Sequence, residues 1–435
     1  MLSAQLSPWT MAWFGTALLA LLLSLILAVT GAVGPGDWSR GAGLAVVHLF
    51  ALGWLGVMML GALIQFVPVL TARPLAHPAL ALPALLATAS GMVALATGFL
   101  WLDGHAGAEL PFLVAPWLLA VGFSLVLAMI LPPLCARATL PLAEVRMVLL
   151  ALIALVPLWG TGAIMVLELS GLHSAGFLPD GLPVHILFGI GGWLSLAAFG
   201  VSYKLFAMFL LAPEAGGRLR RMVFLAASLA LFVLLLALIL GRPGLWLALP
   251  LPLTAGLYLA EIARLWHLRR RPAPEGNMRW SRVALAFLAL TSLMALPALA
   301  IGGAWAEATI FAALTGWLSV LTLAQMVKIT SFLTWIQIFA PRIGRGPVPL
   351  VQDLTDPRAA ARWLTLWSGG AAAGTLSLVL VLPFAFRLSL AALLLAALGL
   401  AQELLSIRRL THLPPALRPI PRPPVLLPPQ AKSCP

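Results

Sequence analysis

Long apolar stretches dominate this sequence and constrain its fold more than any other feature. They cover 11–33, 45–70, 79–101, 112–134, 145–170, 183–212, 221–241, 244–265, 282–302, 306–335, 363–384 and 386–406. Each has roughly the 20 residues that cross a hydrocarbon layer about 30 Å thick. Only 9% of the residues are charged, against about 25% in a soluble domain. We therefore expect an all-α protein with about twelve transmembrane helices, surrounded by the lipid bilayer of a bacterial cytoplasmic (inner) membrane.

The positions of the basic residues predict an orientation. If the N-terminus is cytoplasmic, most of the 26 lysines and arginines lie in cytoplasmic connections or in the C-terminal tail, and the outer connections hold only Arg40, Arg242 and Arg387. This bias predicts that both termini are cytoplasmic. It also explains the net charge of +13 without nucleic acid, which we do not expect as a partner. Residues 1–413 are expected to form one membrane domain, followed by a solvated proline-rich tail over 414–435.

A Gly-Trp-Leu motif occurs in three of the predicted spans, at Trp54, Trp193 and Trp317. These spans are four apart along the chain. The spacing predicts three four-helix repeats, over roughly 11–134, 145–265 and 282–406, around a pseudo-threefold axis. Small residues near the motifs suit either close packing of helices or the approach of a flat cofactor, and both alternatives remain open. They are Gly53, Gly61, Gly191, Gly192, Gly200 and Gly316.

Two of the seven histidines, His48 and His185, lie near the outer start of motif-bearing spans. Neutral imidazole is a common ligand of heme iron and of copper or zinc. His48 and His185 are therefore candidate ligands of a heme b or, less favoured, of copper, with Trp54 and Trp193 as further cofactor contacts. The alternative for each histidine is a hydrogen bond to a neighbouring helix. The remaining five are expected to be solvated: His77, His105, His173, His267 and His412.

Three other charged residues occupy notable places within or beside the spans. Lys204 and Lys328 both lie eleven residues after a motif tryptophan, near the cytoplasmic end of their helices. Each is interpreted either as a lysine that extends to the headgroups or as a contact for an anion, a heme propionate or a proton path. Lys204 is expected about 28 Å from His185 along the helix axis. Glu307, at an outer helix start, is either an interfacial carboxylate or the opening of a proton or cation path.

A histidine followed by Gly53 and Trp54 on the second of twelve spans resembles the catalytic subunit of heme–copper oxidases and nitric-oxide reductases. The chain also resembles their diverged NnrS-type relatives and, in the segment that begins KITSFLTWIQIFAPRIG at Lys328, uncharacterised bacterial members of this superfamily. The resemblance implies three four-helix arcs, with His48 as the ligand of a low-spin heme. However, 221–241 and 306–335 contain no histidine, and no tyrosine follows His185 by four residues. The ligands that would build a binuclear oxygen-reducing centre are thus missing.

We therefore expect a degenerate member of that superfamily that binds a heme b near the outer face. Its role would be electron transfer, a response to gases such as nitric oxide, or the handling of heme or metal, and no catalytic residue is predicted. One alternative is a cofactor-free transporter that uses Lys204, Lys328 and Glu307 as its polar pathway. Another is a structural subunit of a membrane complex. A further membrane or redox subunit is a candidate partner, and whether the chain is an enzyme stays open.

Overall fold

The computed structural model of the chain describes residues 7–104, 109–172, 176–213, 217–241, 244–419 and 424–426. Helices and their connections make up these residues, and no strand occurs among them. The first half contains α1 (Thr10–Leu27), α2 (Gly41–His48), α3 (Val57–Thr71), α4 (Ala81–Leu102), α5 (Glu109–Leu134), α6 (Ala143–Leu169), α7 (Leu178–Ile186) and α8 (Leu196–Leu210). The second half contains α9 (Arg218–Leu240), α10 (Pro250–His267), α11 (Gly276–Ile301), α12 (Gly303–Phe311), α13 (Ser319–Ile338), α14 (Pro357–Val379) and α15 (Pro383–Arg408).

Ten helical segments among the described residues are long and apolar enough to cross a membrane. This is the pattern expected of a multi-pass membrane protein. The predicted spans 244–265 and 363–384 correspond to α10 and α14, which are helical but do not belong to the ten. α10 begins only at Pro250 and carries Glu261 and Arg264, whereas α14 contains two arginines and many small residues. Their lower hydropathy follows from these residues.

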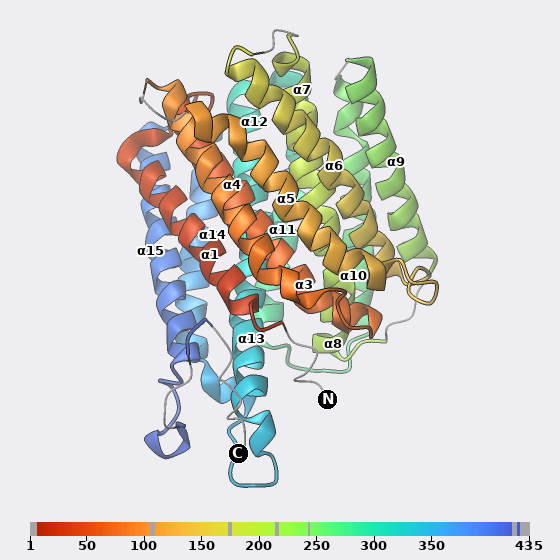
Figure 1. Ribbon diagram of the computed structural model, residues 1–435, viewed down its shortest axis with the longest axis vertical. Coiled ribbons are helices and arrows are strands. Elements are labelled where there is room, and N and C mark those ends of the chain that lie inside the picture. Colours follow the sequence, from red (N-terminus) through yellow and green to blue (C-terminus); the bar gives the residue numbers. More distant parts are fainter. Residues whose placement is uncertain are drawn as a thin grey trace.

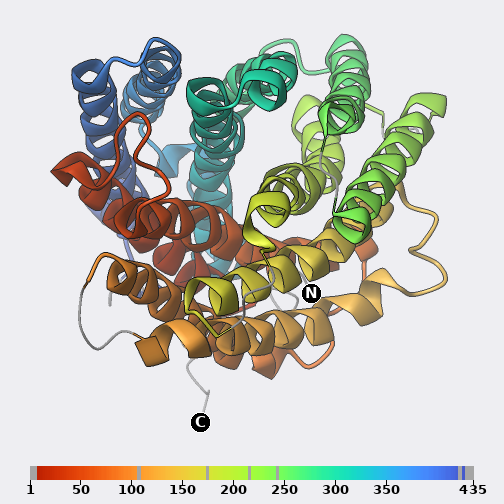
Figure 2. The ribbon, with the colours of Figure 1, turned by 90° about the horizontal axis from the view of Figure 1, so that it is seen from above.

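Three long helices form the centre of the bundle. They are α2–α3 (41–71), α7–α8 (178–210) and α12–α13 (303–338), and each changes to a π-helical stretch in its middle. The π stretches are η3 (Leu49–Gly56), η5 (Leu187–Ser195) and η7 (Ala312–Leu318). In an apolar 18-residue segment of each of these helices, 67–89% of the residues are buried, against 33–44% in the other seven helices. The remaining helices follow one another around this centre, and α15 returns beside α1 (Figure 2).

Buried tryptophans connect the π stretches. Trp54 Nε1 of η3 donates a hydrogen bond to Ser319 Oγ, directly after η7, at 3.0 Å. Trp317 Nε1 of η7 donates to Ser195 Oγ of η5, also at 3.0 Å. Because an indole N–H without a partner is costly in an apolar interior, these two bonds hold the central helices in register.

The six glycines near the motifs serve helix packing. A Cβ atom on Gly61 would lie 2.5 Å from Trp13 Cβ of α1, and one on Gly200 would lie 2.9 Å from the carbonyl oxygen of Glu144 on α6. The other four are similarly close to side chains of neighbouring helices. None of the six lines the large cavity described below. Close helix contact, rather than cofactor approach, therefore accounts for these glycines.

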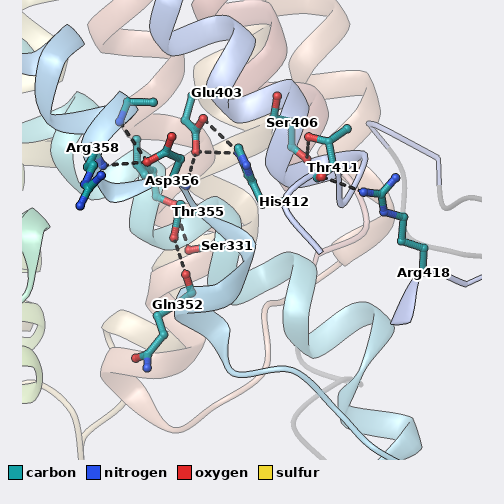
Figure 3. Close-up of polar contacts among 12 residues, drawn as sticks. Ser331, Gln352, Thr355, Asp356, Arg358, Glu403, Ser406, Thr411, His412 and Arg418 are labelled. Atoms are coloured by element: carbon teal, nitrogen blue, oxygen red, sulfur yellow. Dashed lines mark hydrogen bonds and ion pairs between the residues drawn. The ribbon is translucent and has the colours of Figure 1, made fainter. Parts of the chain in front are cut away.

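The bundle has two ends, and the end at which α1 begins and α15 finishes is the lower one in Figure 1. There Glu403 of α15 accepts a hydrogen bond from the backbone N–H of Asp356 and lies 3.1 Å from His412 Nε2 (Figure 3). His412 is exposed, as predicted, and its imidazole is in addition partnered by Glu403. His77 and His267 are exposed as predicted, and His105 and His173 lie outside the described residues.

The tail is not wholly solvated, contrary to the sequence-based expectation. Arg408, which is 3% exposed, donates hydrogen bonds to the carbonyl oxygens of Val425 and Pro424 at 2.7 and 3.1 Å. The same guanidinium donates to Thr334 Oγ1 of α13 at 2.9 Å. A buried guanidinium needs acceptors for its N–H groups, and backbone carbonyls of the tail supply two of them. Part of the described tail thus contacts the lower end, while Pro424 and Leu426 themselves are exposed.

We predict that Ser319→Ala lowers the free energy of unfolding by about 1–3 kcal/mol, because it leaves the buried Trp54 N–H without an acceptor. Thermal unfolding in mild detergent measures the change. Ser292→Ala is the matched control, since Ser292 Oγ bonds only to Leu288 O of its own helix. Equal stabilities of the two variants would contradict the structural role of the Trp54–Ser319 bond.

Candidate cofactor site

A large cavity of about 520 Å³ lies in the upper part of the bundle, and both His48 and His185 line it. Its size falls within the range of small-molecule and cofactor pockets. Apolar side chains from α1, α4, α5, α6 and all three central helices form most of its wall. The aromatic residues among them are Trp38, Phe50, Phe99, Phe123, Trp159, Trp193 and Phe311.

Each histidine stands where a central helix changes from α to π geometry. His48 is the last residue of α2, directly before η3, and His185 is the penultimate residue of α7, two residues before η5. A π stretch inserts extra backbone into a helix turn and redirects the neighbouring side chains, and such stretches are frequent at functional sites. Local helix geometry thus contributes to directing both imidazoles into the cavity.

The two imidazoles face a shared space. Their ring centres are 6.4 Å apart and their planes make an angle of 33°. The ring of Phe99 from α4 lies 4.6 Å from that of His48 and supports it from the side. On the other side, Gly162 of α6 leaves room for His185, because a Cβ atom there would be 3.2 Å from His185 Cε1. The histidines are therefore packed in defined positions.

Hydrogen bonds orient both rings in the same sense. His48 Nδ1 lies 2.8 Å from the carbonyl oxygen of Leu44, which can only accept a hydrogen bond. His185 Nδ1 lies 3.0 Å from Thr161 Oγ1. Thr161 Oγ1 also lies 2.8 and 3.0 Å from the carbonyl oxygens of Pro157 and Leu158, either of which can accept its single hydroxyl hydrogen. In the tautomer in which Thr161 accepts from His185 Nδ1–H, both neutral rings leave the Nε2 lone pair available to a ligand.

Few other polar groups reach the cavity. The carboxylate of Glu307, at the upper end, accepts hydrogen bonds from the backbone N–H of Gly36 at 3.1 Å. Trp193 lines the cavity as predicted for a cofactor contact. Among the described residues no lysine or arginine lines it. The site is thus an apolar chamber with two imidazoles and little charge.

The structure does not bring the other candidate residues to this cavity. Trp54 is fully buried and bonded to Ser319, away from the cavity wall. Lys328 Nζ lies at the lower end, 2.6 Å from Glu275 Oε2 and 5.8 Å from the centre of the Phe209 ring. Lys204 is half-buried in α8 and is likewise absent from the cavity wall. Neither lysine is therefore positioned to contact a heme propionate in this chamber.

Metal ligation has only limited support among the side chains. In the described part of the chain no group of three or more His, Cys, Asp or Glu residues could hold a metal ion. Met58, Met59 and Met326 line a smaller cavity of about 70 Å³ between the central helices, while Met208 is 43% exposed. Methionine commonly fills irregular gaps of this kind, and packing accounts for these residues. The histidine pair remains the one candidate for ligation at the large cavity.

Thr161 and Phe99 are site residues that sequence reasoning missed. Both lie on helices outside the three motif-bearing ones, and their contacts with the histidines join residues 24 and 51 positions apart. A threonine next to Gly162, in the middle of the apolar stretch 147–167, was the one available signal. The sequence around Thr161 does not indicate which helix this threonine faces.

Comparison with known proteins assigns neither a family nor a function to the chain. No protein-family model matches the chain, and no curated protein matches it in sequence. The case for a function therefore rests on the geometry of the site.

At the lower end, Glu275 provides a test of the Lys328 contact. Burial opposes ionisation of Glu275, but hydrogen bonds and charges from Lys328 and Arg271 outweigh it and hold the pKa of this carboxyl below its ordinary value. Its stabilising contribution is therefore complete above the ordinary pKa and is lost as the pH falls through the lower, folded-state pKa.

We predict that Glu275→Gln flattens the acid side of the stability profile. Thermal unfolding in detergent between about pH 6 and pH 3 should cost the wild type more stability than the variant, because only the wild type loses the ion pair. Lys328→Met should flatten the profile in the same direction. Parallel profiles for all three proteins would contradict the ion pair.

Proposed function

We propose that this protein is a membrane electron-transfer protein that binds one heme b between His48 and His185. The separation of the two imidazoles carries the proposal. Two imidazoles on opposite sides of one metal ion, with metal–nitrogen distances of about 2.0–2.1 Å, have ring centres about 6 Å apart. The observed separation of 6.4 Å agrees with this arrangement.

The surroundings of the histidines support the same reading. Histidines that bind a metal usually donate their other N–H to a carbonyl or a similar acceptor, and Leu44 O and Thr161 Oγ1 lie in that position beside His48 and His185. The apolar, aromatic wall and the cavity volume suit a porphyrin. With two cysteines and no CxxC motif in the chain, the heme would be held without thioether bonds.

The ligand set favours electron transfer over the other roles. A heme with two axial histidines supplies one-electron chemistry and leaves no open coordination position for a gas. The transporter alternative has weaker support. Glu307 and Lys328 lie at opposite ends of the bundle and are held by Gly36 and Glu275, respectively. Copper is also less favoured, because only two nitrogen ligands converge.

The proposal includes an orientation and an internal symmetry. The three central helices share the Gly-Trp-Leu motif, the π stretch and the buried position, which supports three four-helix repeats around a pseudo-threefold axis. Most basic residues belong to the lower end, as in the loop between α10 and α11. By the positive-inside rule that end is cytoplasmic, together with both termini, and the heme lies near the outer face of a bacterial inner membrane.

Optical spectra of the full chain purified in mild detergent test the function. We predict a stoichiometric, low-spin b-type heme in the wild type, with sharp absorption bands on reduction. His48→Ala and His185→Ala should each remove one ligand of the heme iron. Either the affinity for heme then falls at least tenfold, or the heme that remains bound becomes high-spin and binds carbon monoxide.

His267→Ala is the matched control, because His267 is exposed at the opposite end of the bundle. It should leave the spectrum unchanged. A folded wild-type protein that neither retains heme during purification nor binds added hemin would refute the proposed function.

Thr161 offers a second test, of the orientation of His185. We predict that Thr161→Val lowers heme affinity by about 10–100-fold, the usual effect of losing the acceptor behind a ligating histidine. Thr161→Ser, which keeps the hydroxyl, should restore most of the affinity. Hemin titrations followed by absorbance provide the measurement, and equal affinities of the Val and Ser variants would show that the hydrogen bond does not matter.

A further inference from the structure

The hairpin of α10 and α11 carries more positive charge than its own carboxylates balance. Residues 250–301 contain six arginines but only two acidic residues, Glu261 and Glu275. Each carboxylate is already held by two basic side chains. These are Arg220 and Arg264 at Glu261, and Arg271 and Lys328 at Glu275. The other four arginines of the hairpin form no ion pair with any residue that the structure describes: Arg269, Arg270, Arg279 and Arg282.

Two of these four arginines converge on one tryptophan at the lower end. Arg282 Cζ of α11 lies 5.0 Å from the centre of the Trp266 ring of α10, and Arg269 Cζ lies 6.0 Å from the same centre. Arg269 Nη1 also donates a hydrogen bond to the carbonyl oxygen of Trp266 at 2.7 Å. The indole is half-buried, whereas both arginines are exposed. Because an aromatic ring attracts cations, Trp266 holds two guanidinium groups at the surface of the hairpin.

Arg282 lies on the outer surface of a helix that is apolar enough to cross a membrane. It follows the first residue of α11 by six positions, or about 9 Å along the helix axis. Leu293 and Leu296, further along the same side of α11, are 78% and 52% exposed. A charged side chain on such a surface is costly unless its head reaches a polar group. Helical side chains lean toward the N-terminus of their helix, so Arg282 is directed to the lower end.

We propose that Arg282 and Arg269, held on Trp266, bind the phosphate group of an anionic phospholipid at the lower end of the bundle. A guanidinium group binds phosphate oxygens through paired N–H donors. The exposed leucines of α11 offer a surface for the acyl chains, and tryptophan is typical of the membrane–water interface. The ammonium group of a zwitterionic lipid would be repelled by the unpaired arginines, so an anionic headgroup is favoured. The site lies apart from the large cavity and does not depend on heme.

Binding of phosphatidylglycerol to the full chain in mild detergent tests the inference. Native mass spectrometry during a titration gives the dissociation constant of the first bound lipid. We expect the wild type to bind phosphatidylglycerol more tightly than phosphatidylcholine. Arg282→Gln should weaken binding of phosphatidylglycerol about tenfold, the effect of losing one charge-assisted contact. Arg282→Lys should weaken it less, because it keeps the charge and loses only the paired donors.

Arg362→Gln is the matched control. Arg362 is likewise exposed near the start of its helix, α14, at the lower end, but it contacts no aromatic ring among the described residues and lies near Asp356. The substitution removes the same charge and should leave the affinity for phosphatidylglycerol nearly unchanged. Trp266→Leu, which keeps an apolar side chain but removes the ring, should weaken binding by a smaller factor than Arg282→Gln.

Three results would overturn the inference, and none of them bears on heme binding. Equal losses of affinity in Arg282→Gln and Arg362→Gln would show a diffuse attraction to the basic surface instead of a site. Equal affinities of the wild type for phosphatidylglycerol and phosphatidylcholine would remove the role of the anionic headgroup. Displacement of phosphatidylglycerol by an equal concentration of inorganic phosphate would assign the arginines to a free anion.

Discussion

The packing of three central helices through buried tryptophans is the interaction on which the rest of the structure depends. In a hydrocarbon environment an indole N–H has no water to bond to, so its partner must come from another helix. Trp54 and Trp317 find Ser319 and Ser195 in this way, which ties η3 and η5 to η7. The surrounding helices then pack against a centre whose geometry is already determined, and glycines such as Gly61 and Gly200 permit their close approach.

The candidate site follows from where this centre is incomplete. Among the described residues no indole bond joins η3 to η5, and the large cavity extends into this side. His48 and His185 stand above that opening, at the points where their helices change from α to π geometry. Leu44 and Thr161 lie within hydrogen-bond distance of Nδ1 of the two rings. The open side between η3 and η5 thus provides space for the proposed heme, and the two histidines lie beside it.

Much of the architecture could be predicted, because it depends on local hydropathy and length. All twelve predicted spans correspond to helices, and ten of these have the composition of membrane spans. His48, His185 and the motif tryptophans also stood out in the sequence, since ionisable and amphipathic groups in apolar stretches need partners. The roles of individual residues were less predictable. The spacing that made Trp54 and Trp193 equivalent did not reveal that one is bonded and the other faces a cavity.

By itself, the sequence determined that the chain is a bundle of long apolar helices, and it singled out His48 and His185, which line one cavity. These properties follow from the residues within single segments. Only the tertiary structure decided that Lys328 meets Glu275, that Arg408 binds the tail and that Thr161 orients His185. Each of these contacts depends on which faces of separate helices adjoin, and residues far apart in the chain acquire neighbours only when the bundle has packed.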